Sequence, residues 1–470
     1  MTTKLTASGV EGSAEDALRL LTHSGARLVS IFGSVDESGA KRVYAIAEVN
    51  REYRIVNVAV TGALASVTPM CPAAAWYERE LHDRFGIEIE GHPDLRPLVY
   101  HPADYTFLQV QGVGVCELPV GPVHAGIIEP GHFRFSVMGD TVLHLEPRLF
   151  YTHKGTETLF EGMSVLKGTA LAESVSGDNC FAHAVAYCQS VENAFGISVP
   201  PRGRAIRLIG LELERMMAHI ADVGALCGDV GCVVPAAYTA RIKESLLQAS
   251  ARLIGTRYWR GTATPGGVRR DISAENAQRF GEVVAHAAAD FVEMARIILD
   301  TPSVLNRFEG AGILSNEMAR DLGAVGVVAR ASGVRMDVRR DHAYGHYRNI
   351  TVETPHSQHG DVLARARMRI EETRVSARLI KDALKELAAG IVCTQVPCDG
   401  SAEGFSAVES PRGELLYWIR IRNGRIARCH IKSPSFQNWP CLPLAVAGNI
   451  SADFPLINKS FNLSYSGCDR

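Results

Sequence analysis

The strongest constraint on the fold is a set of five long stretches with helical patterns. They begin after about residue 120 and cover residues 177–197, 203–227, 236–261, 274–300 and 360–389. Helices of this length gain most of their stability by packing apolar faces together, which predicts a helical bundle. The core of a bundle is also a common place for a site built from facing helices.

The first hundred residues have a different pattern, which is typical of a small α+β unit. Residues 13–25 predict a helix with Ser13 as its N-cap candidate and Gly25 at its end. Three β-rich runs follow, "RLVSIFGSV", "KRVYAIAEV" and "EYRIVNVAV", and the turn residues between them predict a meander. A second helix is expected over "PAAAWYERELHDRFG", with Pro72 near its first turn and Gly86 after its end.

Short β-hairpins are expected at both ends of the helical part. "HFRFSVMGDTVLHLEPRLF" turns at "GD", and "GELLYWIRIRNGRIARCHIK" alternates around "NG". A length of 470 residues favours two or more domains. We therefore predict an α+β protein: a small α+β domain over 1–110, a linker over 111–120, and a mainly helical bundle domain over 121–470.

Composition favours a globular protein inside the cell. Hydrophobic residues make up 46% and charged residues 21% of the chain, and a net charge of −2 gives no reason to expect nucleic acid as a partner. No apolar run is long enough to span a membrane, and the first twenty residues lack a signal-peptide pattern. The eleven cysteines form no C-x-x-C pair, so we expect reduced, mostly buried thiols.

Two further patterns carry less weight. His342 and His346 have helical metal-ligand spacing, but they lie in a Gly- and Tyr-containing turn without a carboxylate third ligand, so we favour a structural role. "GVGVC" at 112–116 lacks the third glycine and the following helix of a dinucleotide-binding loop.

Strings along the whole chain resemble two subunits of respiratory complex I. "WYERELHDRFGIEIEGHPDLRPL" (Trp76 to Leu98) is similar to the signature of the small, 30-kDa peripheral-arm subunit, a docking module without a cofactor. From residue 121 on, "GHFRFSVMGD", "YTHKGTETLFEG", "RLIGTRYWRGTATPGGVRRDI" and "SPSFQNWPCLPLAVAGN" resemble, in order, the 49-kDa subunit that complex I shares with membrane-bound [NiFe] hydrogenases. A fusion of both modules is typical of formate hydrogenlyase large subunits.

The resemblance implies a metal site whose ligands are missing. In active relatives two C-x-x-C pairs hold nickel and iron, because soft thiolates suit nickel. The four ligand positions fall here on Ser176, Asn179, Ser464 and Gly467. Cys180 and Cys468 each lie one place after a ligand position, and one residue is a rotation of about 100° on a helix, so we expect Cys180 to point elsewhere. We predict no [NiFe] centre and no cofactor in this chain.

Both quinone contacts implied by complex I are also absent, because their positions fall on Gly177 and near Glu129 or Pro130. We expect a polar cavity instead, with His124, Asp178 and Asp229 as candidate proton-handling residues. Burial raises the pKa of a carboxyl group, and a nearby base tunes it. The alternative is that these residues only fill space with satisfied hydrogen bonds.

The resemblance further implies a [4Fe-4S] cluster in a neighbouring small iron–sulfur subunit, faced by Lys154, Arg257 and Arg260. A cation beside a cluster raises the reduction potential of the cluster, whereas the alternative role for these residues is interface ion pairing. A ferredoxin-like subunit and integral membrane ion-translocating subunits are the other implied partners. The chain would lie peripherally on the cytoplasmic face of the cell membrane.

These expectations combine into a function. We expect a subunit of a complex-I-like, formate hydrogenlyase-like oxidoreductase that receives electrons from the iron–sulfur subunit and couples their use to ion translocation. Two alternatives stay open: an active hydrogenase with unusual ligands, and a non-catalytic scaffold. No NADH-binding fingerprint occurs, so any NAD binding would belong to partner subunits.

Overall fold

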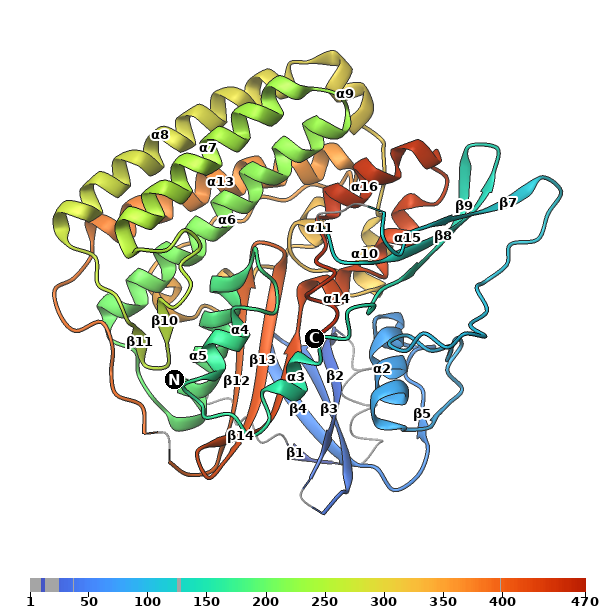
Figure 1. Cartoon of the computed structure of the whole chain (residues 1–470), viewed down its shortest axis with the longest axis horizontal. Coiled ribbons are helices and arrows are strands. Elements are labelled where there is room, and N and C mark those ends of the chain that lie inside the picture. The colour runs from blue at the N-terminus through green and yellow to red at the C-terminus, as the bar shows by residue number, and fades with distance from the viewer. Residues whose placement is uncertain (1–9, 13–24, 37, 125–127, 398) are drawn as a thin grey trace.

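Two modules lie against each other in the computed structural model, which describes residues 10–12, 25–36, 38–124, 128–397 and 399–470. Figure 1 shows a small module of strands and one helix in blue, and a larger module in which long helices lie above the strands β12 to β14. The fold class is α+β, as the sequence predicts. None of the helices in the described ranges has the length and apolar content needed to cross a membrane.

The small module is a four-stranded sheet in the order β1-β4-β3-β2. Its strands are β1 (Val10–Glu11), β2 (Arg27–Val35), β3 (Lys41–Val49) and β4 (Glu52–Ala59). The predicted meander is confirmed, since β2, β3 and β4 pair antiparallel, while β1 runs parallel to β4. Helix α2 (Ala75–Phe85) packs on β2 and ends at Gly86, also as predicted. The helix predicted over 13–25 lies outside the described residues, apart from Gly25.

Two short strands, β5 (Leu64–Ala65) and β6 (Ile89–Glu90), pair beside α2, which follows the 3-10 turn η1 (Pro72–Ala74).

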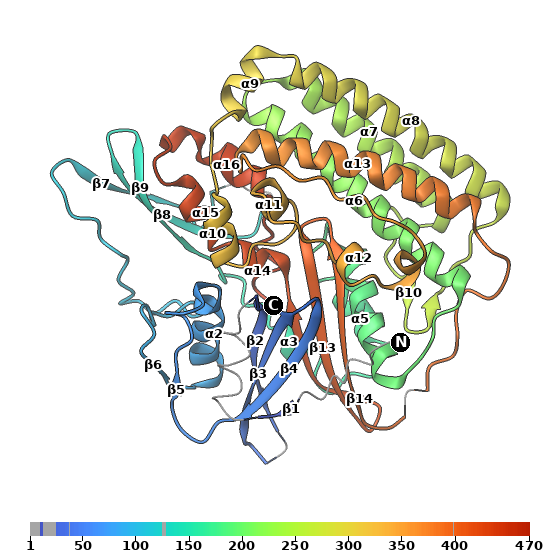
Figure 2. The same ribbon diagram turned by 180° about the vertical axis from the view of Figure 1, so that it is seen from behind.

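The five predicted long helices are all present. They are α5 (Cys180–Phe195), α6 (Pro201–Asp229), α7 (Val233–Ile254), α8 (Ala274–Leu299) and α13 (Val362–Lys385). Their ends differ from the predicted ends by a few residues: α5, α8 and α13 are shorter, whereas α6 is longer at both ends and α7 begins three residues earlier. Figure 2 shows α13 from behind, alongside α6 to α8. Helix α7 ends seven residues earlier than predicted, because Gly255 and Trp259 both adopt the left-handed conformation, at φ +77° and +60°.

The predicted hairpins are each part of a three-stranded sheet. The first contains β7 (Val115–Val120), β8 (His132–Met138) and β9 (Thr141–Arg148), and the second β12 (Ala402–Ser410), β13 (Gly413–Arg422) and β14 (Arg425–Lys432). Strand β7 lies within residues 111–120, which the sequence predicts to be a linker. That strand is mostly exposed and lacks apolar alternation, so only its pairing with β8 defines it.

Short elements complete the large module: α3 (Thr156–Leu159), α4 (Gly168–Ala172), β10 (Ala263–Thr264), β11 (Gly267–Val268), α9 (Pro302–Phe308), α10 (Asn316–Asp321), α11 (Gly326–Ala331), α12 (Val338–Asp341), η2 (Gly345–Asn349), α14 (Pro434–Asn438), α15 (Cys441–Val446), η3 (Ser451–Asp453) and α16 (Phe454–Phe461).

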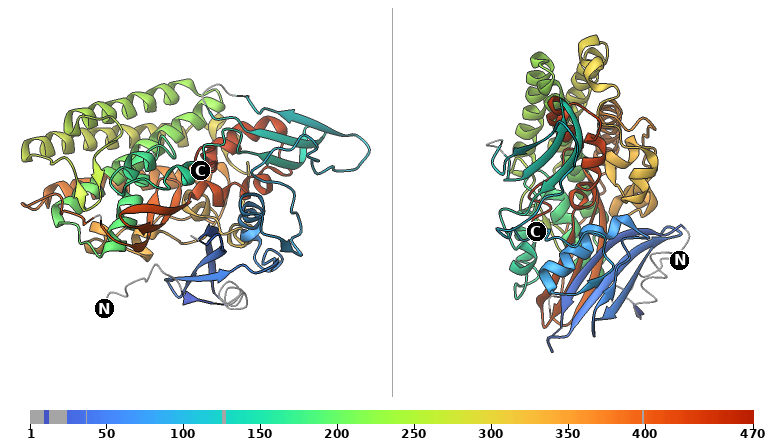
Figure 3. Two further views of the ribbon diagram at one scale, coloured as in Figure 1. Left: turned by 60° about the horizontal axis from the view of Figure 1, so that its bottom comes forward. Right: turned by 90° about the vertical axis from the view of Figure 1, so that its right-hand side faces the viewer.

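The two modules meet where the sheet β2–β4 faces the sheet β12–β14, as both views in Figure 3 show. One buried apolar cluster draws residues from both sheets: Val29, Phe32, Tyr44, Ile46, Tyr53, Ile55, Phe405, Leu416 and Trp418. The C-terminal residue Arg470 is fully buried and donates to Glu80 of α2 at 2.8 Å. The small module therefore helps to anchor the C-terminal tail, which carries half of the site described next.

Candidate functional site

Two segments that are far apart in sequence meet in the candidate site: the turn before α5 and the tail after α16. Their contact is a hydrogen bond of 3.0 Å between the Oγ atoms of Ser176 and Ser464. Gly467 donates its N–H to Ser464 Oγ at 2.9 Å, and a Cβ on Gly467 would lie 2.8 Å from Ser433 Oγ. Three of the four expected ligand positions therefore converge, as the resemblance implies, but a side chain at the glycine would meet a filled space.

Asn179, at the fourth position, is buried at the N-cap of α5. Its N–H donates to the carbonyl of Ser176 at 3.2 Å, so the first two positions share one tight turn. Its Oδ1 has no hydrogen-bond partner among the residues that the structure describes. The turn also explains why α5 begins three residues later than its pattern predicts.

The residues present do not fit a nickel–iron centre. They provide two hydroxyls, an amide and a glycine, none of which is a soft thiolate ligand. Cys180, which follows Asn179 in the sequence, donates from Sγ to the carbonyl of Tyr258 at 3.1 Å. The expectation that Cys180 points elsewhere is confirmed.

Asp178 forms a bidentate ion pair with Arg412, with N–O distances of 3.0 and 2.5 Å, and also accepts a hydrogen bond from Ser176 at 3.0 Å. The Asp178 side chain is 55% exposed. Desolvation by the surrounding protein raises the pKa of the Asp178 carboxyl. The charge of Arg412 and the hydrogen bonds from Arg412 and Ser176 more than offset this effect and hold the pKa well below its usual range. The expected raised pKa at Asp178 is therefore wrong, because an arginine that sequence reasoning missed lies opposite it.

A raised carboxyl pKa does occur one layer deeper, at Glu214 of α6. This side chain accepts the N–H groups of Phe181 and Ala182 at 2.7 and 3.0 Å, so it caps the N-terminus of α5. Complete burial raises the pKa of Glu214 to about 8, and the charge on Asp178 adds to the rise. Sequence reasoning missed Glu214. The apolar periodicity of α6 predicts which face of that helix is buried, but it does not predict that this face meets the N-terminus of α5.

Lys154 contacts both segments of the site, the turn before α5 and the tail after α16. Its Nζ donates to the carbonyl of Val175 at 2.9 Å and to the hydroxyl of Ser466. Burial lowers the pKa of Lys154. The same region surrounds His183, whose Nδ1 lies 2.8 Å from Tyr417 Oη and whose pKa burial lowers to about 3.

The two arginines that were predicted together with Lys154 separate in space. Arg260 borders the site, since its guanidinium lies 3.9 Å from the place where a Cβ on Gly177 would be. Arg257 instead forms an exposed ion pair with Glu244 at 2.6 Å.

The remaining two candidates lie at the margins. His124 is exposed, and its ring packs edge-on against Phe133 with a centroid distance of 5.4 Å and lies 6.4 Å from the ring of Tyr465. Asp229 ends α6 and pairs with Lys459 of α16 at 2.5 Å. Among the described residues, no hydrogen bond or ion pair joins Asp229 to the serines, so proton-handling roles for these residues stay predictions.

Two family models match the chain. The model described as respiratory-chain NADH dehydrogenase, 49 Kd subunit, matches residues 229–399 and 395–470. The chain belongs to this 49-kDa subunit family. The model described as respiratory-chain NADH dehydrogenase, 30 Kd subunit, matches residues 11–110, which confirms the fusion of the two modules in this 49-kDa family member.

Several proteins are similar to this 49-kDa family member over most of their length. Hydrogenase-4 component G of Escherichia coli (strain K12) is 35% identical over an alignment of 434 positions, which covers 86% of this chain and 75% of that protein. Formate hydrogenlyase subunit 5 of the same organism is 34% identical over an alignment of 438 positions, which covers 86% of this chain and 76% of that protein. NADH-quinone oxidoreductase subunit 4 of Thermus thermophilus is 30% identical over an alignment of 388 positions, which covers 76% of this chain and 94% of that protein.

These similarities confirm that the chain is a subunit of an oxidoreductase of the complex I and hydrogenase type. The relatives are components of multi-subunit complexes, so partner subunits are implied here too. In this 49-kDa family member the site holds the pair of serines, with Arg412 paired to Asp178 and Glu214 at the start of α5.

Proposed function

We propose that this chain serves an ion-translocating, complex-I-like oxidoreductase in which buried proton-binding groups take the place of a metal centre. Electrons would arrive through a [4Fe-4S] cluster in a neighbouring small iron–sulfur subunit. One observation carries the proposal: the hydroxyls of Ser176 and Ser464 meet at the turn before α5, and Glu214, a carboxyl whose pKa burial raises to about 8, accepts N–H groups of the first turn of the same helix. A group that titrates near neutral pH is suited to proton transfer.

A second such carboxyl lies deeper in the molecule. Burial raises the pKa of Glu409 to about 7, and the charge of Asp337 adds to the rise. Arg215 donates to the backbone carbonyls of Glu409 and Ser410 at 2.7 and 3.1 Å. Ser410 lies two positions before Arg412 in the sequence. Arg215 follows Glu214 in α6, so this arginine stands next to one titrating carboxyl in the sequence and bonds to the backbone of the other.

The cations at the site support the proposal of an iron–sulfur cluster in a neighbouring subunit. Lys154 and Arg260 lie on two sides of the turn before α5, where a cation would favour the reduced form of a nearby cluster. Arg257 contributes less in this proposal, because Glu244 neutralises it. We further propose that the complex contains a ferredoxin-like subunit and ion-translocating membrane subunits, and that this chain lies on the cytoplasmic face of the membrane. Co-purification from membranes and protease accessibility in sided vesicles test these points.

Ion transport by membrane vesicles that contain the assembled complex tests the central idea. Glu214→Gln and Asp178→Ala should each abolish most of the transport while native gels show normal assembly. Asp290→Asn, at an exposed surface pair with Arg241, is the matched control and should transport normally.

A scaffold role is the second candidate, and the Asp178–Arg412 pair favours it, because a carboxylate held in its ionised form is suited to structure. Normal transport in both site variants, with assembly intact, would establish the scaffold and refute the proposal.

Metal analysis of the purified complex provides an independent test. We expect nickel far below one atom per complex and no hydrogen-dependent dye reduction. Stoichiometric nickel together with that activity would show an active hydrogenase with unusual ligands.

A further inference from the structure

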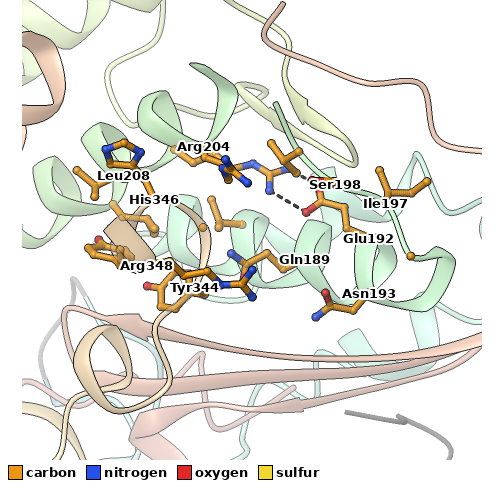
Figure 4. Close-up of a pocket in the computed structure, with 17 residues that line it drawn as sticks. Gln189, Glu192, Asn193, Ile197, Ser198, Arg204, Leu208, Tyr344, His346 and Arg348 are labelled. Carbon is orange, nitrogen blue, oxygen red and sulfur yellow. Dashed lines mark hydrogen bonds and ion pairs between the residues drawn. The ribbon is translucent and has the colours of Figure 1, made fainter. Parts of the chain in front are cut away.

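A cavity of about 520 Å³ lies at the other end of α5 from the serine site. It is bordered by the end of α5, the start of α6 and the 3-10 turn η2, as Figure 4 shows. Along α5 the lining begins at Val185, roughly 7.5 Å along the helix axis from Cys180, and it includes none of the residues of the candidate site. Its volume is in the range typical of small-molecule pockets.

The charges that remain unpaired in this cavity are positive. Glu192 is the carboxylate of the lining, and Arg207 neutralises it in a bidentate pair at 2.9 and 2.5 Å. Glu192 also accepts the N–H of Gly266 at 2.7 Å. By contrast, Arg204 and Arg348 have no carboxylate within 4.0 Å in the part of the chain that the structure describes.

Two buried nitrogen atoms in the same cavity are left without partners. Arg204 Nε and His346 Nδ1 are inaccessible to water and make no hydrogen bond to any described residue. Buried polar atoms are nearly always satisfied in proteins, so the wall of this cavity is short of hydrogen-bond acceptors. Burial lowers the pKa of His346, and Arg204 lowers it further against the opposing charge of Glu386.

The rest of the lining is suited to an organic group. Val185, Leu208 and Leu211 form an apolar wall, and the ring of Tyr344 adds an aromatic face. Gln189 adds an amide that can hydrogen-bond to a polar part of a ligand.

We propose that this cavity binds a small organic phosphate. The phosphate group lies between Arg204 and Arg348 and accepts from their terminal guanidinium nitrogens, while an apolar or aromatic body packs against Leu208 and Tyr344. Arginine suits this role because its planar guanidinium binds phosphate oxygens through two parallel hydrogen bonds. The site is independent of the proposed function, since it shares no residue with the serine site.

Calorimetric titration of the full-length chain tests the site with three probes: inorganic phosphate, adenosine 5′-monophosphate and vesicles of phosphatidylglycerol. We expect the nucleotide to bind more tightly than phosphate alone, because only the nucleotide fills the apolar part. Binding of the vesicles without the nucleotide would also support the phosphate site and would identify a lipid headgroup as its source.

The matched variants are Arg348→Met, which changes an exposed side chain and so spares the fold, and Arg204→Met. Each should weaken binding about tenfold or more, since each removes charge-assisted hydrogen bonds. Arg296→Met, at an exposed position on α8, should leave binding unchanged. Failure of all three probes to bind, or equal binding by the Arg348→Met and wild-type chains, would overturn the inference.

Discussion

Serine and cysteine differ by one atom, and at Ser176 and Ser464 that atom decides which chemistry is available. A hydroxyl both donates and accepts hydrogen bonds, and these two do so with each other, with Asp178 and with the N–H of Gly467. A thiolate would instead bind a soft metal ion. The two segments are therefore joined by hydrogen bonds at the positions where the sequence resemblance implies metal–sulfur bonds.

The protonation of Glu214 is a prediction at the residue scale. Its pKa is about 8 in the folded chain and 4.5 in an ordinary environment, so between these values only the folded state holds the proton. The free energy of unfolding therefore falls as pH rises through this window, by up to about 1.4 kcal/mol per pH unit. In Glu214→Gln this slope should disappear, which urea unfolding at pH 5.5, 6.5 and 7.5 measures.

The quantity to compare is the difference in unfolding free energy between the wild-type chain and Glu214→Gln. The contributions of the other titrating groups cancel in this difference. That difference should shift steadily in favour of the variant as pH rises. A difference independent of pH would show that Glu214 is ionised in the folded chain.

At the scale of elements, close packing of α5 on β12 sets the position of the site. Gly404 of β12 lies so near the helix that a Cβ there would be 1.8 Å from the carbonyl oxygen of Ser190. The helix can approach the strand only because this position lacks a side chain. The same helix carries the serine turn at its start and borders the cavity at its end.

Gly404→Ala should therefore destabilise the chain by about 2 kcal/mol or more, because helix and strand must separate. Gly281→Ala in α8 is the matched control: its new Cβ would lie 3.5 Å from Leu384, an ordinary contact. The control should be neutral or stabilising by about 0.5–1 kcal/mol, since alanine favours helix over glycine. Urea unfolding measures both, and an unchanged stability for Gly404→Ala would contradict the packing argument.

At the scale of the whole molecule, a buried charge cluster joins the two modules. Glu414 of β13 accepts from Arg27 of the small module at 2.8 and 3.0 Å and from Lys432 at 2.8 Å, and Tyr53 donates to it at 2.7 Å. Burial raises the pKa of Glu414, but Arg27 and Lys432 more than offset this and hold it well below its usual range. The attachment of the small module therefore depends on an ionised carboxylate.

Glu414→Gln leaves the fully buried Lys432 without a counter-charge and should cost about 3–5 kcal/mol of stability at pH 7. Because the folded pKa is depressed, this contribution is present above the ordinary pKa of 4.5 and is lost as pH falls below it. Thermal unfolding at pH 7 and pH 4 should show a smaller gap between variant and wild type at the lower pH. Glu244→Gln, at an exposed pair with Arg257, is the control, and a cost equal to that of Glu414→Gln would contradict the prediction.

The sequence by itself determined the class of fold, the two modules, the long helices and the absence of thiols at the ligand positions. Each of these depends on local apolar periodicity or on residue identity along the chain. It did not reveal the strands β7 and β12, whose own patterns are weak and whose pairing with β8 and β13 defines them.

Only the tertiary structure decided the electrostatics of the site. Asp178 was expected to have a raised pKa, but Arg412, 234 positions away in the chain, lowers it, and the raised pKa belongs to Glu214, which fits against the start of another helix. The physical reason is that the pKa of a carboxyl depends on burial and on charges within a few ångströms in space. Those neighbours come from distant parts of the chain, and no local pattern identifies them.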